Sequence, residues 1–157
     1  AKKNEGAKNM TTYLDSSAIV KRYVAEAGSD IVEEIYEATL NGEQKIAFSA
    51  WNIGEVLGVL DRYYRRKWLD KKDYQTARIQ FIGETLKLIR LKLVKIVPVK
   101  IELLTYTWSL IEKHHIYQAD ALQIASAKRA EATDFLTGDK KLAETAAKEG
   151  LNTTYLG

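Results

Sequence analysis

Short runs of β-branched and apolar residues recur along the chain, and longer segments with an apolar residue every three or four positions separate them. The short runs predict strands, and the longer segments predict amphipathic helices. We predict strands at residues 11–14, 45–49, 94–99, around 135–136 and at 153–156. The predicted helices cover residues 18–28, from 29 or 30 to 41, 50–69, from 70 or 73 to 93, 101–114 and 140–150, and one more begins at Asp120.

Strands that alternate with helices over the whole length predict a parallel sheet covered by helices on both faces. No internal repeat or low-complexity tract interrupts the pattern. We therefore predict one α/β domain of about five strands over residues 10–157. Residues 1–9, AKKNEGAKN, precede it as a predicted flexible extension, and they lack the apolar core of a signal peptide.

Composition excludes several classes of protein. No apolar stretch reaches the roughly 18 residues of a membrane-spanning helix. Zero cysteines exclude disulfides, zinc–thiolate sites and thiol catalysis, and they fit a cytoplasmic protein. The net charge is only +3, but if cations neutralised four of the 21 acidic residues, 24 basic side chains would face 17 acidic ones. Such a surface suits a polyanion.

Most acidic residues lie among lysines and arginines, but four do not: Asp15, Glu55, Asp120 and Asp139. Asp15 and Asp139 follow the first and fourth predicted strands. Glu55 lies about one turn into the helix after the second strand, and Asp120 begins the helix before the fourth. Because the carboxyl ends of parallel strands share one edge of the sheet, we expect the four side chains to converge there.

Carboxylates brought close together repel one another and hold protons unless cations neutralise them. All-oxygen ligands suit Mg²⁺ or Mn²⁺, and two such ions at ~3.5–4 Å activate a water and stabilise the leaving oxygen of a phosphodiester. Ser17 and Thr137 each lie two residues from an acid and are candidate supporting hydroxyls. The pattern therefore predicts a metal-dependent hydrolytic site.

Three of the acids have a structural explanation when taken alone. Asp15 and Asp139 each precede a predicted helix, where a side-chain oxygen caps free N–H groups. Asp120 complements the positive end of its own helix. Glu55 has no such explanation, because it lies in the apolar segment 53–60 without an adjacent basic residue.

Four segments in this order carry a resemblance: LDSSAIVKRY, the Glu of WNIGEVLGVLDR, ADALQIASA and FLTGD. They resemble the motifs of PIN-domain ribonucleases, and in particular the VapC-type toxins of toxin–antitoxin pairs. The resemblance implies a PIN-like three-layer sandwich with a parallel sheet in the order 3-2-1-4-5. It also implies a Mg²⁺- or Mn²⁺-dependent endoribonuclease acting on RNA, a homodimer, and inhibition by a cognate antitoxin. By position it makes metal-binding catalytic acids of Asp15, Glu55, Asp120 and Asp139, with Ser17 and Thr137 as supporting hydroxyls.

Residues 62–72, RYYRRKWLDKK, interleave aromatic and basic side chains, as a surface for single-stranded nucleic acid does. Cations are also favourable at a helix C-terminus, so the RNA-binding role stays open for Arg62, Arg65, Arg66 and Lys67. Lys21 and Arg22, about two turns after Asp15, are further candidates for a phosphate contact.

Alternatives remain at this point. A PIN-fold RNA-processing nuclease would share the chemistry, and a catalytically silent RNA- or protein-binding domain would share only the fold. A phospho-acceptor switch is a looser alternative, based on Asp15, Thr137 and Lys140. The adjacent His114 and His115 predict a solvated helix end rather than a metal pair, because neighbouring side chains on a helix diverge.

Overall fold

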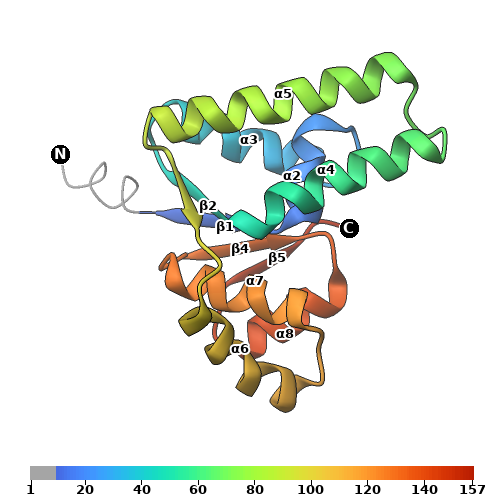
Figure 1. The fold of residues 1–157 in the computed structure, drawn as a ribbon. Helices are drawn as coiled ribbons and strands as arrows, with labels where there is room; N and C mark the ends of the chain where they lie inside the picture. Colours follow the sequence, from blue (N-terminus) through green and yellow to red (C-terminus); the bar gives the residue numbers. More distant parts are fainter. Residues whose placement is uncertain (1–9) are drawn as a thin grey trace.

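The computed structural model describes residues 10–157, so the predicted flexible extension at residues 1–9 lies outside the described residues. Five strands form one parallel sheet in the order β3-β2-β1-β4-β5 (Figure 1). They are β1 Thr11–Leu14, β2 Lys45–Ser49, β3 Val94–Val97, β4 Asp134–Thr137 and β5 Thr153–Tyr155. The predicted fold class and strand order are confirmed. Receiver-type domains have the order 2-1-3-4-5, so this topology contradicts the phospho-acceptor alternative.

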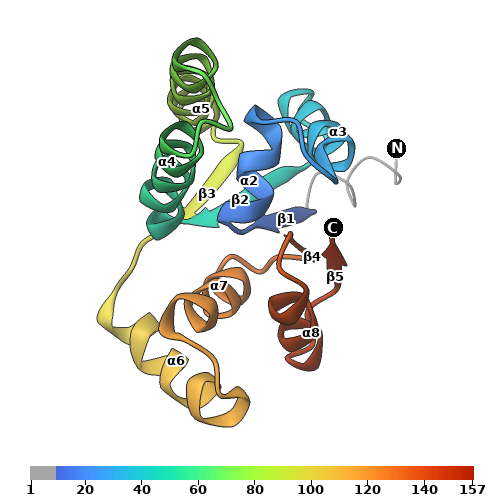
Figure 2. The same ribbon diagram turned by 90° about the vertical axis from the view of Figure 1, so that its right-hand side faces the viewer.

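Helices cover both faces of the sheet, as Figures 1 and 2 show. On one face lie α2 Ser16–Tyr23, α3 Ser29–Leu40, α4 Ala50–Arg65 and α5 Lys71–Arg90. On the other lie α6 Ile101–His114, α7 Gln118–Arg129 and α8 Lys140–Lys148. Among residues 10–157, none of the helices has both the length and the apolar composition that crossing a membrane requires.

The central strand shows how the sequence divides the core between these two layers. Successive side chains of a strand point to opposite faces, so Tyr13 packs in the core with α6, α7 and α8, and Leu14 packs in the core with α2 to α5. Both are fully buried. On the α7 side the Tyr13 ring stacks on Phe135 of β4, with 5.4 Å between the ring centroids. The strand is therefore apolar on both faces, as expected for a parallel sheet.

Several predicted element ends are wrong by a few residues. The helix predicted to reach residue 69 ends at Arg65, because Lys67 adopts a left-handed conformation with φ 60°. The third strand ends at Val97 because Pro98 has no N–H to continue the ladder. The first helix ends at Tyr23 instead of residue 28, and α7 begins at Gln118, two residues before Asp120.

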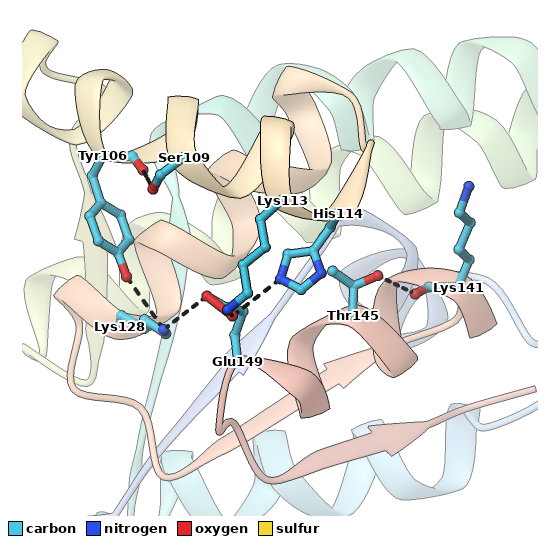
Figure 3. Close-up of polar contacts among 8 residues, drawn as sticks. All are labelled: Tyr106, Ser109, Lys113, His114, Lys128, Lys141, Thr145 and Glu149. Atoms are coloured by element: carbon cyan, nitrogen blue, oxygen red, sulfur yellow. Dashed lines mark hydrogen bonds and ion pairs between the residues drawn. The ribbon is translucent and has the colours of Figure 1, made fainter.

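The helices of the α6–α8 layer are joined by polar contacts around one carboxylate, shown in Figure 3. Glu149 after α8 accepts hydrogen bonds from Lys113 at 2.9 Å and pairs with His114 at 3.1 Å and Lys128 at 3.7 Å. The bond from Lys113 lowers the pKa of Glu149, and His114 and Lys128 lower it further. The prediction of a solvated end is wrong for His114, whose side chain is only 10% exposed, while His115 is exposed.

Candidate active site

A cavity of about 650 Å³ opens at the carboxyl edge of the sheet. Its walls come from α2, the part of α4 from Glu55 to Tyr63, the start of α7 and the connection from β4 to α8. All four predicted acids line it: Asp15, Glu55, Asp120 and Asp139. Residues that lie up to 124 positions apart in the sequence thus face one space, because the parallel strands end at the same edge.

Asp15 lies at the base of this cavity and is 6% exposed. It is the N-cap of α2, and its Oδ1 accepts hydrogen bonds from the Ala18 amide at 2.9 Å and the Ser17 hydroxyl at 2.6 Å. Its Oδ2 accepts the Thr137 hydroxyl at 2.5 Å. Burial raises the pKa of Asp15 from 3.8 to about 6, although these three hydrogen bonds act in the opposite direction.

The two predicted supporting hydroxyls also join α2 to the connection after β4. The Ser17 hydroxyl accepts the Gly138 amide at 2.8 Å, and the Thr137 hydroxyl accepts the Asp139 amide at 3.0 Å. The same two side chains therefore orient the Asp15 carboxylate and set the position of the backbone that carries Asp139.

Glu55 is held by two polar side chains that the sequence analysis did not select as site residues. Its Oε1 accepts the Ser16 hydroxyl at 2.7 Å and the Asn52 amide at 3.2 Å. Asn52 also donates to the Ser16 hydroxyl at 2.8 Å, and both residues are buried. A half-buried acid in an apolar helix segment is thus explained by a fixed hydrogen-bond arrangement.

This arrangement continues into the core through Gln123 of α7. The Gln123 Oε1 accepts hydrogen bonds from the Tyr13 hydroxyl at 2.7 Å and from Asn52 at 2.9 Å. Asn52 and Gln123 each lie three residues along a helix from an acid, which places them on the same helix face as Glu55 and Asp120. That spacing is the signal that would have identified them.

Asp120 and Asp139 are less enclosed. Asp120 is half-buried in the first turn of α7, and no hydrogen bond to its carboxylate occurs within residues 10–157. Burial raises the pKa of Asp120, and the charges of Asp139 and Glu55 raise it further, against an opposing effect of Lys141. Asp139 is exposed and is the N-cap of α8, accepting the Leu142 amide at 3.1 Å. Asp139 therefore caps α8 and also lines the cavity.

The acids share a cavity without forming one tight cluster. Within the described part of the chain, no three acidic or histidine side chains gather closely enough to hold a metal ion together. The carboxylates that line the cavity are thus separate from one another.

The predicted RNA-binding residues differ in position. Arg62 lines the cavity and is exposed, whereas Arg65 pairs with Asp61 at 2.8 Å. The Arg66 guanidinium lies over the Trp68 ring, 5.2 Å from its centroid. The fourth candidate, Lys67, is exposed in the turn after α4. The structure therefore brings only Arg62 of these four to the acids.

Comparisons with known proteins agree with the topology. The family model of the PIN domain matches residues 12–148. A comparison with curated protein sequences finds no match.

One solved structure with a similar fold is VapC20 of Mycobacterium tuberculosis, a toxin that cleaves the sarcin–ricin loop. Its TM-score is 0.59, and it is 15% identical over 89% of this chain and 95% of the VapC20 chain. FitAcB of Neisseria gonorrhoeae has a TM-score of 0.63 and 17% identity over 90% and 95% of the two chains. VapBC2 of Rickettsia felis, bound to a DNA fragment of its promoter, has a TM-score of 0.59 and 16% identity over 94% and 100%. At these identities the similarity establishes the fold.

Proposed function

Because the chain belongs to the PIN-domain family, we propose that it is a metal-dependent endoribonuclease that hydrolyses RNA phosphodiester bonds. The observation that carries this proposal is the single cavity lined by Asp15, Glu55, Asp120 and Asp139. A catalytically silent binding domain would have no need for four acidic side chains around one cavity, one of them buried and none of them in an ion pair within residues 10–157.

The donor chemistry of the cavity fits Mg²⁺ or Mn²⁺. Asp15 is buried at the cavity base, and within residues 10–157 none of the four acids forms an ion pair with a basic side chain. Mg²⁺ usually takes one or two carboxylates together with waters, so separate carboxylates around an open space suit it. When bound, the ion would activate a water and stabilise the charge of the leaving oxygen.

The protein groups have distinct proposed roles. Ser17 and Thr137 hold both oxygens of Asp15 in one orientation, and Ser16 does the same for Glu55. Asp120 has a raised pKa and no protein hydrogen bond within residues 10–157, so we assign it the proton from the attacking water.

The test uses a random-sequence single-stranded RNA library and the purified protein. Asp120→Asn should lower the cleavage rate at least about 100-fold, the usual range for a positioned acid or base, with little change in the folded state. Glu144→Gln is the matched control, because Glu144 is an exposed acid on α8. Excess EDTA should stop cleavage and Mn²⁺ should restore it. Full activity of Asp120→Asn, or full activity in EDTA, would refute the proposed function.

We propose further that the protein is a toxin with a protein antitoxin as partner, that it forms a homodimer, and that residues 10–157 form a PIN domain. The similarity to VapC20 and VapBC2 supports the first part. Growth arrest on expression of the wild-type chain, absent for Asp120→Asn, is the expected result. Light scattering of the purified protein tests the dimer.

A further inference from the structure

We propose that Lys21 of α2 binds a phosphate of the RNA in the cavity, as a positioning residue for cleavage. The inference rests on the proposed function and concerns a side chain beyond the four acids. Its basis is a lysine whose stem is buried, which lines the cavity and whose amine has no hydrogen-bond or ion-pair partner within residues 10–157.

Lys21 is 6% exposed, which is unusual for a lysine, and it lines the cavity with the four acids. It lies one turn after Ser17, so it shares the helix face that contacts Asp15. Its side chain runs along Gly138, where an added methyl group would lie 3.1 Å from the Lys21 Cε. The stem is therefore packed between α2 and the connection that carries Asp139.

The amine at the end of this stem has no protein partner within residues 10–157. It forms neither a hydrogen bond nor an ion pair there, although four carboxylates line the same cavity. The Lys21 Nζ atom is not among the fully buried polar side-chain atoms that lack a partner in residues 10–157, so it keeps contact with solvent while its stem is buried. Packing of the stem alone would not require a charge at its end.

The next residue shows what a structural cation looks like in this fold. Arg22 donates two hydrogen bonds to Glu84 of α5, at 3.0 Å and 3.1 Å, and its guanidinium lies 5.0 Å from the centroid of the Tyr36 ring. Arg22 thus joins α2 to the helices beside it. Lys21, in contrast, lines the cavity together with the four acids and forms no ion pair within residues 10–157.

A phosphodiester is a ligand that suits both the Lys21 ammonium and the carboxylates of this cavity. Its anionic oxygens bind an ammonium as a point charge, and they also coordinate divalent ions held by carboxylates. Within residues 10–157 the ammonium pairs with none of the acids, so it remains available for an RNA strand.

The test compares Lys21→Met and Lys21→Arg with Lys87→Met, in which an exposed lysine of α5 outside the cavity is replaced. All variants carry Asp120→Asn, which should slow cleavage enough for titration, and the probe is a fluorescein-labelled 12-nucleotide RNA of mixed sequence. Anisotropy titrations at several KCl concentrations measure its affinity and salt dependence. Thermal unfolding is recorded in parallel.

We expect Lys21→Met to bind the RNA about tenfold more weakly, and the slope of log K against log[KCl] to fall by about 0.7, the value for one phosphate contact on a single strand. Lys21→Arg should keep the slope. The thermal midpoint of Lys21→Met should stay within a few degrees of that of the parent, since Met fills the space of the buried stem and no ion pair is lost.

An unchanged affinity and slope for Lys21→Met would overturn the inference, and so would a midpoint several degrees below that of Lys87→Met, which would indicate a structural role. Cleavage by the wild-type protein is tested separately, so these results leave the proposed nuclease standing. Failure of the parent to bind RNA at all would also overturn the inference, and the separate cleavage assay would then decide the proposed function.

Discussion

Replacing Asp15 by Asn should stabilise the metal-free protein while abolishing its activity. The Asp15 carboxyl is buried, and its folded-state pKa is about 6 against an ordinary value of 3.8. Because the folded pKa is the higher one, the folded state binds more protons between these values, and stability falls as the pH rises from 3.8 to about 6. Above pH 6 the full penalty of the ionised carboxylate is present.

The size of the effect follows from the shift of about two pKa units, which corresponds to ~3 kcal/mol at 1.36 kcal/mol per unit. Asn keeps an oxygen for the Ser17 hydroxyl and the Ala18 amide, but its NH₂ group faces the Thr137 hydroxyl, which donates to the carboxylate in the wild type. Losing that hydrogen bond costs about 1 kcal/mol. The net gain is therefore ~2 kcal/mol, or about 5 °C in Tm for a domain of this size.

Urea unfolding followed by circular dichroism in EDTA, at pH 4 and pH 7.5, measures the difference between the two proteins. We expect Asp15→Asn to be more stable at pH 7.5 and the advantage to shrink or reverse at pH 4, where the wild-type carboxyl is largely protonated. Adding Mn²⁺ at pH 7.5 should stabilise the wild type much more than the variant. A variant that is less stable at pH 7.5, or an advantage independent of pH, would refute the reasoning.

Three further outcomes are expected. Ser16→Ala removes the hydroxyl that donates to Glu55, so Mn²⁺ binding measured by calorimetry should weaken about tenfold, the lower end of the range for residues that orient metal ligands. Arg62→Gln should lower kcat/KM for RNA several-fold while Arg65→Gln changes it little, because only Arg62 lines the cavity, as cleavage assays would show. Glu149→Gln should cost roughly 1–2 kcal/mol at pH 7 in urea unfolding, and the loss should fade below about pH 4, because a carboxylate with a lowered pKa stabilises only above its titration range.

The fold was largely predictable because its signals are local. Strand residues such as those of 45–49 and the helix at 101–114 have a period and a composition that their neighbours do not share, and both match the structure. The end of α4 was not predictable in this way. Lys67 adopts a left-handed conformation that a sequence usually marks with glycine or asparagine, and here neither is present.

Part of the site geometry has only a weak local signal. The acids stand out because charged residues in apolar surroundings need an explanation, whereas the sequence marks Asn52 only by its position three residues before Glu55. Its importance comes from contacts with Ser16, 36 positions earlier, and Gln123, 71 positions later. Such contacts exist only after the chain has folded. For the same reason the sequence could not distinguish Arg62, which lines the cavity, from Arg65, which pairs with Asp61.

The charges of the cavity explain why one site would bind both a metal ion and a phosphate. If Lys21 formed an ion pair with one of the acids, each would satisfy the other, and the folded protein would gain stability without a need for ligands. Instead the ammonium is packed along Gly138, and the Asp15 carboxylate is held by hydroxyls and an amide. Neutral donors orient a carboxylate without cancelling its charge, so attraction for a cation remains. Because the two charges do not pair with each other within one cavity, ligands of opposite sign can compensate both, and under the proposed function a metal ion bound to an RNA phosphate would do so.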